Sequence, residues 1–432
     1  MDPSIIGIFV SLAVIVFLAL RGVGIMLIAP LAVVIVALFS SMDVLDTLLG
    51  PYMKGFVNYA GKFYLIFLFA SVFGKYMDDS GAARAIAGNI LKATGTGSQL
   101  YVLLAISLIT TLLTLGGVSL FVVIFAIMPI ARPLFKQMNI PWHLFLAPFY
   151  FGIGSLSMTM IPGTPSVLNI MPTKYLGTTP TAAPILGLSA ALFVTVFCVL
   201  YMKRQLALSK TRGEVYEESA EVAAASAKIQ DKRLPNFWIS LVPPVAVIVA
   251  LNVVRIDIVW SLVIGCLVAA ACFWRHVENH MTTLNAGAFN SAVPVINTCA
   301  DVGYGMAVAA TSGFKILTDL LVAIPGNPVI SLTVATYLMT GITGSASGGL
   351  GIVLETLMGK YVAMGLNHDM LHRVVAIAAG SFDALPHNGV VITTLAVAGL
   401  THRQAYRHIW YTHVVSTFFA MFIVGALAIL IY

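Results

Sequence analysis

A polar, helix-breaking segment interrupts a long apolar run near the end of the chain. The segment is GSFDALPHNGVV, residues 380–391, and its Pro386 cannot donate a backbone hydrogen bond to a helix. It also carries four polar side chains: Ser381, Asp383, His387 and Asn388. In hydrocarbon every backbone N–H and C=O group must be paired internally, so such a break persists only where protein or a water-filled cavity surrounds it. Ionisable side chains at that depth indicate a path for a substrate or an ion.

The composition is that of a polytopic, all-α membrane protein. Of the 432 residues, 59% are hydrophobic and 9% are charged, against about 25% charged in a typical soluble domain. The net charge of +6 comes mostly from Lys and Arg in short loops, as positive-inside topology requires, so it does not indicate nucleic-acid binding. The four cysteines lie in apolar segments, with neither the CxxC spacing nor the nearby histidines that would make a metal site. We therefore expect buried thiols, no metal site and no cofactor.

Two apolar runs are too long for single spans. Residues 101–130 would be about 45 Å long as one straight helix, against a hydrocarbon core of about 30 Å. We predict a re-entrant hairpin near 101–131 that bends at the paired Gly116 and Gly117. A second hairpin is predicted near 329–362, with its bend at TGSASGG, residues 343–349.

Two broken helices and one polar linker complete the predicted organisation. The first broken helix, 143–171, contains GSLSMTMIPGTPS, and the second, 372–400, contains GSFDALPHNGVV. Residues 203–235 form the one long polar stretch and are rich in Lys and Arg, so we expect a cytoplasmic linker there. The linker separates a first transmembrane half, 1–202, from a second, 236–432.

The two halves match each other at a constant offset of 226 residues. Matching pairs include Thr110 with Thr336, Thr114 with Thr340, Ser119 with Ser345, Gly154 with Gly380, and Ser155 with Ser381. Because one offset holds over about 45 residues without a gap, we predict an internal repeat. Secondary transporters built from such repeats bind their substrate near the membrane midplane, between the halves.

With these motifs the chain resembles the gluconate permease (GntP) family of proton symporters, within the ion-transporter superfamily. The likeness covers essentially the whole chain: Asp-Asp-Ser-Gly at 78–81, the tips at 116–119 and 345–349, and GSFDALPHNG. This last stretch, with the following ITTLAVAGLTHRQAY, is similar to the branch of short hydroxy-acid permeases, especially for 3-hydroxybutyrate. The Asn-Asp-Ser-Gly motif of sugar-acid members is absent from the corresponding region, which argues against gluconate. The resemblance implies inverted repeats, homodimers, elevator-like motion and a multi-pass protein of the bacterial inner membrane.

Hydroxyl groups and helix N-termini at the breaks are the expected ligands of a small carboxylate. The first choices are at the hairpin tips: Gly117, Ser119, Ser345 and Ser347. The second choices follow the prolines of the broken helices: Thr164, Ser166 and Asn388. The alternative is that these side chains only cap broken helices or satisfy freed backbone groups.

Proton coupling requires an ionisable group inside the membrane, and Asp383 is the best candidate. His387 lies four residues further on and could share the proton if a helix persists between the two. Glu355 and Asp301 are further carboxylates in apolar runs. The alternative for each is a structural hydrogen-bonding role.

Three functions fit this pattern to different degrees. The first is a proton-coupled symporter of a short hydroxy monocarboxylate. The second is a gluconate or other sugar-acid symporter, or a sodium-coupled carrier of a di- or tricarboxylate; the lack of a basic residue at either tip argues against several substrate charges. The third is an intramembrane enzyme, but the sequence contains neither HExxH nor GxSxG. We therefore expect a transporter and not an enzyme.

Overall fold

The computed structural model describes residues 2–21, 23–94, 97–118, 120–217, 234–322, 327–386 and 388–432. Within these ranges every regular element is a helix. Four of the helices are long and apolar enough to cross a membrane: Val44–Asp79, Pro184–Thr211, Phe237–Val254 and His402–Ile431. His368–Ala384 and Gly389–Leu395 form a further candidate span, which is bent by 53° at its break. The predicted all-α membrane protein is confirmed.

The first half begins with a helical hairpin and ends with a long span. Its elements are α1 (Pro3–Leu20), α2 (Ile25–Phe39), α3 (Val44–Thr47), η1 (Leu48–Tyr52), α4 (Met53–Asp79), α5 (Ala82–Thr94), α6 (Gln99–Leu115), α7 (Leu120–Gln137), η2 (Trp142–Phe145), α8 (Leu146–Tyr150), η3 (Phe151–Met160), α9 (Val167–Leu176) and α10 (Pro184–Thr211). Helix α10 therefore includes the first nine residues of the stretch predicted as a linker.

The second half repeats this order. Its elements are α12 (Phe237–Val249), η4 (Ala250–Val254), α13 (Ile258–Cys272), α14 (His280–Ala309), α15 (Ser312–Val322), α16 (Pro328–Thr343), α17 (Ala346–Thr356), α18 (Met358–Ala363), α19 (His368–Ala379), η5 (Phe382–Ala384), α20 (Gly389–Ala398), α21 (His402–Ile409), η6 (Trp410–Val415) and α22 (Ser416–Ile431). Each half thus contains a hairpin, a long helix with a short successor, a second hairpin, a broken helix and a final span.

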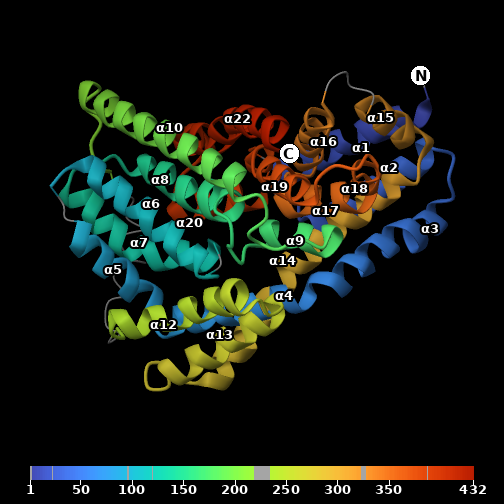
Figure 1. Ribbon diagram of the computed structural model, residues 1–432. Helices are drawn as coiled ribbons and strands as arrows, with labels where there is room; N and C mark the ends of the chain where they lie inside the picture. Colours follow the sequence, from blue (N-terminus) through green and yellow to red (C-terminus); the bar gives the residue numbers. More distant parts are fainter. Residues whose placement is uncertain are drawn as a thin grey trace.

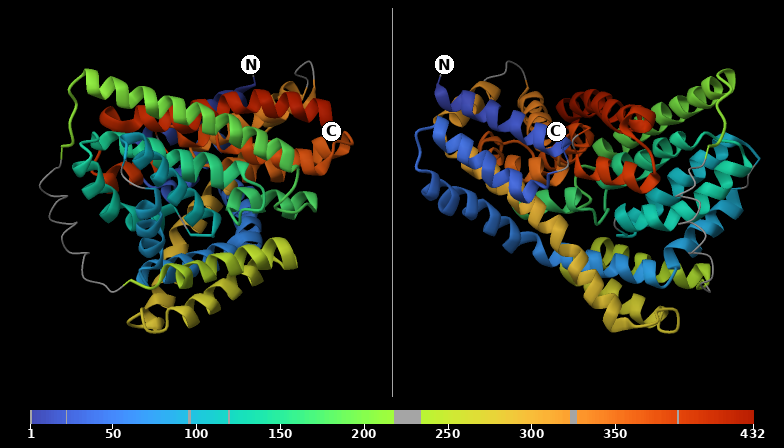
Figure 2. Two further views of the ribbon diagram at one scale, coloured as in Figure 1. Left: turned by 60° about the vertical axis from the view of Figure 1, so that its left-hand side comes forward. Right: turned by 180° about the vertical axis from the view of Figure 1, so that it is seen from behind.

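Long helices hold the two halves together. Helices α4 and α14 pack along each other, and α10 and α22 form a second pair on the opposite side of the molecule (Figures 1 and 2). The hairpin of α12 and α13 lies at one edge and packs on α4 and α5 (Figure 2). The hairpins of α6 with α7 and of α16 with α17 lie between these two pairs (Figure 1).

Contacts between the two broken helices follow the 226-residue repeat. Trp142 Nε1 donates to the carbonyl oxygen of Ala398 at 2.9 Å. In the matching contact His368 Nδ1 lies 3.0 Å from the carbonyl oxygen of Leu176. His368 is the repeat partner of Trp142, and Leu176 lies four residues after the partner of Ala398. Each broken helix therefore packs its first segment against the last segment of the other.

Glycines allow the chain to reverse at both hairpin tips. Gly117 has φ +89° and Gly344 has φ +59°, left-handed values that glycine adopts at little cost. The first tip bends where the sequence predicted, after α6, and the second bends after α16. The first broken helix has an unusual form, because η3 is a π-helix that ends before Pro162 and Pro165. Such wide turns are frequently found at functional sites.

Candidate functional site

The helix after the first break and the helix after the second hairpin tip lie side by side (Figure 1). Near their C-termini the hydroxyl of Tyr175 in α9 donates to Glu355 in α17. One turn earlier a Cβ on Gly351 would lie 3.6 Å from Met171 Cε. Met171 precedes Tyr175 in α9, and its partner Gly351 precedes Glu355 in α17. The contacting residues therefore follow the same order along both helices, so α9 and α17 run parallel. Their N-termini consequently lie at the same end.

Serine residues cap both of these N-termini. Ser166 Oγ accepts from the backbone N–H of Asn169 at 3.3 Å, and Ser345 Oγ accepts from that of Gly348 at 3.1 Å. The capping alternative considered for these two serines is therefore correct as a description of their local bonds. The remaining free N–H groups and the helix dipoles make this region attractive to an anion.

The N-termini of α7 and α20 reach the same region. A Cβ on Gly117, at the first tip, would lie 3.6 Å from Cγ of Pro165 in the first break. At the second break Asn388 Nδ2 donates to the carbonyl oxygens of Gly344 and Asp383, at 2.6 and 2.7 Å. Helices α7 and α20 also contact each other. Four half-helices from the two halves therefore begin in one region.

Thr164 and Ser347, two further predicted substrate ligands, lie around these N-termini. Ser119 lies outside the described residues. Thr164 is 1% exposed and donates to Ser166 Oγ at 3.3 Å. The hydroxyl of Ser347 lies 3.3 Å from that of Thr298. Both halves therefore contribute hydroxyl groups to this region.

Asp301 brings a carboxyl group from α14 to the second hairpin tip. It is 4% exposed, and its carboxyl group lies close enough to the Ser345 side chain to interact with it. The packing is tight, because a Cβ on Gly348 would lie 2.7 Å from Asp301 Oδ2. Asp301 thus faces a predicted ligand directly. The sequence identified it only as a carboxylate in an apolar run.

Asp383 is buried at the second break and is hydrogen-bonded to a histidine. Its Oδ1 lies 2.9 Å from Nε2 of His413, and the two side chains are 12% and 3% exposed. The other ring nitrogen, His413 Nδ1, lies 3.2 Å from Ser155 Oγ in η3. No side chain fits at the neighbouring Gly154, because its Cβ would lie 2.5 Å from that nitrogen. The contacts of His413 with Asp383 and Ser155 therefore join both broken helices to the π-helical turn η6.

The condition on which proton sharing between Asp383 and His387 depended, a helix that persists between them, is not met. The helix does not persist, since η5 ends at Ala384 and Leu385 is extended with ψ 162° before Pro386. Proline disfavours a helical conformation in the residue before it, which explains the bend. His387 itself lies outside the described residues. His413 is the histidine that pairs with Asp383, and an imidazole within the last apolar span was the signal for it in the sequence.

Glu355 lies away from the tips. It is nine residues beyond the start of α17, or about 14 Å along the helix. Its carboxylate forms an ion pair with Lys62 at 2.7 Å and accepts from Tyr175. These contacts join α17 to α4 and α9. The structure therefore does not bring Glu355 together with Asp383.

A fully buried arginine connects the two broken helices. Arg373 in α19 donates to the carbonyl oxygens of Thr159, Pro180 and Ala182 and to Asn169 Oδ1, at 2.9–3.2 Å. The sequence pattern gave no indication of this role. Because both terminal nitrogens and Nε are engaged with the first half, its guanidinium is a clamp between the halves and not an open anion site.

The sequence model for GntP family permeases matches residues 3–261 of this chain. The chain belongs to the GntP permease family. It is 33% identical over 458 residues to an uncharacterized transporter, YxjC, of Bacillus subtilis, covering 96% of each chain. It is also 24% identical over 329 residues to an uncharacterized transporter of Haemophilus influenzae, covering 74% of each. This GntP permease is therefore a multi-pass membrane transporter and not an enzyme.

Two solved transporters share the fold of this GntP permease. The YdaH transporter of Alcanivorax borkumensis aligns with a TM-score of 0.55 at 14% identity, covering 89% of this chain and 88% of that one. MtrF of Neisseria gonorrhoeae, described as illuminating a class of antimetabolite efflux pumps, aligns with a TM-score of 0.57 at 12% identity. That match covers 88% of this chain and 84% of the other. At such identities the likeness concerns the fold alone.

Proposed function

We propose that this permease is a symporter that moves one proton with a short hydroxy monocarboxylate such as 3-hydroxybutyrate. The convergence of four helix N-termini supports an anionic substrate, because their N–H groups and dipoles favour negative charge without a buried basic residue. We assign the substrate carboxylate to the N-termini capped by Ser166 and Ser345, with Asn388, Thr164 and Ser347 around it.

The observation that carries proton coupling is the buried pair of Asp383 and His413. An imidazole and a carboxyl group at 2.9 Å can hold one proton between them and accept a second when the substrate arrives. Asp383 lies in the break that also contributes Asn388 to the tip, so substrate and proton would reach adjacent groups. Glu355 is not included, because it lies in an ion pair away from the tips.

The charges around the tips favour a monocarboxylate. Arg373, the arginine of the second broken helix, has its guanidinium engaged by first-half carbonyl groups. A second or third substrate carboxylate would therefore have to be desolvated without a basic partner, at a cost of several kcal/mol. The proposal therefore includes both a single negative charge on the substrate and coupling to a proton.

Uptake into proteoliposomes tests which acid the permease transports and which ion drives the transport. Labelled 3-hydroxybutyrate, lactate, gluconate, succinate and citrate are each offered with an inward pH gradient and, separately, with an inward sodium gradient. We expect accumulation of the short hydroxy acids with the pH gradient only. Sodium-driven uptake of succinate or citrate would replace the proposal with a di- or tricarboxylate carrier. Preference for gluconate would place the permease with the sugar-acid members.

We also propose, from the family resemblance, that the permease is a homodimer of the bacterial inner membrane with elevator-like alternating access. Light scattering of the purified protein in detergent is expected to give the mass of a dimer of the 46.0 kDa chain. A monomer mass that persists in lipid nanodiscs would contradict this.

A further inference from the structure

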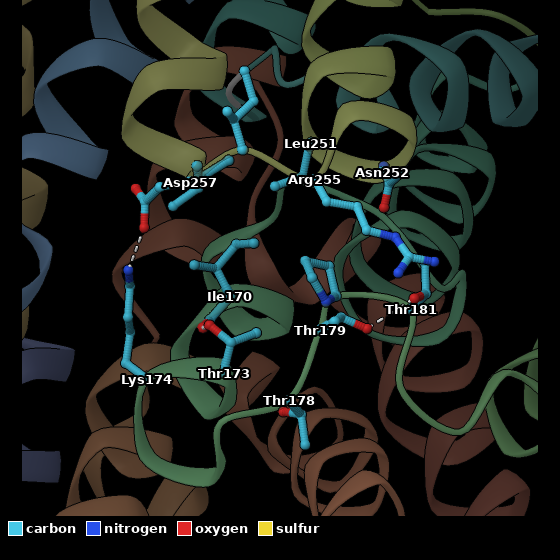
Figure 3. Close-up of a pocket in the computed structure, with 13 residues that line it drawn as sticks. Ile170, Thr173, Lys174, Thr178, Thr179, Thr181, Leu251, Asn252, Arg255 and Asp257 are labelled. Carbon is cyan, nitrogen blue, oxygen red and sulfur yellow. Dashed lines mark hydrogen bonds and ion pairs between the residues drawn. The ribbon is translucent and has the colours of Figure 1, made fainter.

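A pocket separate from the hairpin tips lies between α9 and the turn that joins η4 to α13 (Figure 3). Its volume is about 360 Å³, within the range of small-ligand sites. One wall is formed by α9 and the loop after it, including Thr173, Lys174 and Thr181. The other wall includes Asn252 and Arg255. The proposed transport mechanism gives this pocket no role.

The pocket carries one unopposed positive charge. Lys174 is neutralised by Asp257 at 2.6 Å. Partial burial of the Asp257 carboxyl raises its pKa, but the hydrogen bonds from Lys174 and Val259 hold this pKa below its usual value. The ion pair therefore persists at neutral pH. The side chain of Arg255 has no ion pair or hydrogen bond to any other described residue, although its backbone N–H donates to the carbonyl oxygen of Ala250. Figure 3 shows its guanidinium turned towards Thr181.

The backbone of Arg255 is strained in a way that positions this charge. Its φ of +61° lies in the left-handed region, which residues other than glycine seldom adopt. The repeat provides a comparison, because Arg21 occupies the matching turn after α1. Arg21 lies over the ring of Phe17 in its own helix, at 5.0 Å from the centroid. Only the second-half arginine of this pair borders the pocket.

Hydrogen-bonding groups of both kinds border the same space. The hydroxyls of Thr179 and Thr181 share one hydrogen bond of 2.9 Å, which leaves one hydroxyl proton to donate. Asn252 donates through Nδ2 to Gly163 in the first break and to Ile248, at 2.8 and 3.2 Å. Its Oδ1 is buried and accepts no hydrogen bond within the described part of the chain. A bound group with both a negative charge and a donor would satisfy these side chains.

The pocket lies where the chain leaves the membrane. The apolar span Phe237–Val254 ends immediately before Arg255. The side chains of Val253, Val254 and Trp260 around this turn are 72%, 64% and 64% exposed. Exposed aliphatic and tryptophan side chains at the end of a span are typical of the membrane interface. A phospholipid headgroup is therefore available at this depth.

We propose that this pocket binds the headgroup of a phospholipid whose phosphodiester pairs with Arg255 and whose hydroxyl or ammonium group donates to Asn252 Oδ1. Phosphatidylglycerol and phosphatidylethanolamine carry such a donor, whereas phosphatidylcholine does not. A free anion with a donor, such as a hydroxy acid, has related chemistry, and the experiment separates the two sources. The proposal does not depend on the identity of the transported substrate.

Native mass spectrometry of the delipidated permease, titrated with each of the three lipids, tests the proposal. Arg255→Asn removes the charge but keeps a residue that tolerates the left-handed region, and Arg21→Asn is the matched control. We expect phosphatidylglycerol and phosphatidylethanolamine to bind more tightly than phosphatidylcholine. Loss of one charge-assisted contact should weaken their binding on the order of tenfold in Arg255→Asn and leave Arg21→Asn unchanged.

Three results would overturn the proposal. The first is lipid binding that Arg255→Asn leaves unchanged. The second is equal weakening by both substitutions, which would indicate a general loss of surface charge. The third is specific binding of soluble glycerol 3-phosphate or 3-hydroxybutyrate that is lost in Arg255→Asn while lipid binding persists; the pocket would then take a free anion.

Discussion

If the proposed function is correct, replacing Asp383 by asparagine should separate proton coupling from substrate binding. The amide has nearly the same shape, and its oxygen can still accept the hydrogen bond from His413 Nε2, now 2.9 Å long. Only the ability to titrate is lost. If one proton moves with each singly charged substrate, transport is electroneutral, and a gradient of one pH unit supplies about 1.4 kcal/mol, or roughly tenfold accumulation.

The assay measures the accumulation ratio of labelled 3-hydroxybutyrate in proteoliposomes under a pH difference of about one unit. Potassium and valinomycin clamp the membrane potential. We expect roughly tenfold accumulation by the wild-type protein and a ratio near one for Asp383→Asn, with exchange of preloaded substrate retained by both. Protein-free liposomes correct for permeation of the neutral acid, and Glu355→Gln is the control carboxylate. Concentrative uptake by Asp383→Asn at the wild-type ratio would refute the coupling role.

Further variants test the packing around the site. Gly154→Ala places a Cβ 2.5 Å from the buried imidazole of His413 and should reduce both thermal stability and uptake. The control Gly61→Ala, whose Cβ would have nothing within 4 Å, should change neither. Equal melting temperatures of the two variants would refute the close contact. Arg373→Lys leaves carbonyl groups between the halves without donors and should destabilise the protein by about 2–4 kcal/mol, measured by unfolding in detergent; a change below about 0.5 kcal/mol would contradict the clamp. Ser345→Ala should raise the apparent KM severalfold, while Ser98→Ala, which removes an exposed cap of α6, should not; identical KM values would remove this serine from the proposed site.

The irregular elements were predictable where local backbone chemistry decides them. Paired glycines and the length of an apolar run located the first hairpin, and prolines located both breaks. These signals are local, because a proline ends a helix whatever packs against it. The π-helical turns η3 and η6 had no such signal. Their wide turns are adopted in a packed environment that the sequence pattern does not describe.

Pairings between distant segments were not predictable in the same way. Asp383 and His413 are 30 residues apart, and Arg373 is about 190–215 residues from its acceptors. Sequence spacing favoured His387 as the partner of Asp383, because four residues make one helical turn, but that inference required a continuous helix. The repeat also could not reveal these pairings. Its offset aligns residues of equal type, whereas Asp383 and His413 match Ser157 and Gly187.

This asymmetry between the halves indicates how a proton and the substrate would be coupled in the proposed symporter. Both halves contribute a break and a hairpin tip, but the titratable pair belongs to the second half alone. The first half reaches that pair through Ser155, whose hydroxyl lies 3.2 Å from His413. With no space for a side chain at Gly154, a displacement of η3 would alter this contact and with it the partner of Asp383. Because η3 is followed by the break that ends at Ser166, movement of the backbone proposed to bind the substrate would change the affinity of the pair for a proton. Thermodynamic linkage makes the effect reciprocal, so protonation of the pair would favour substrate binding.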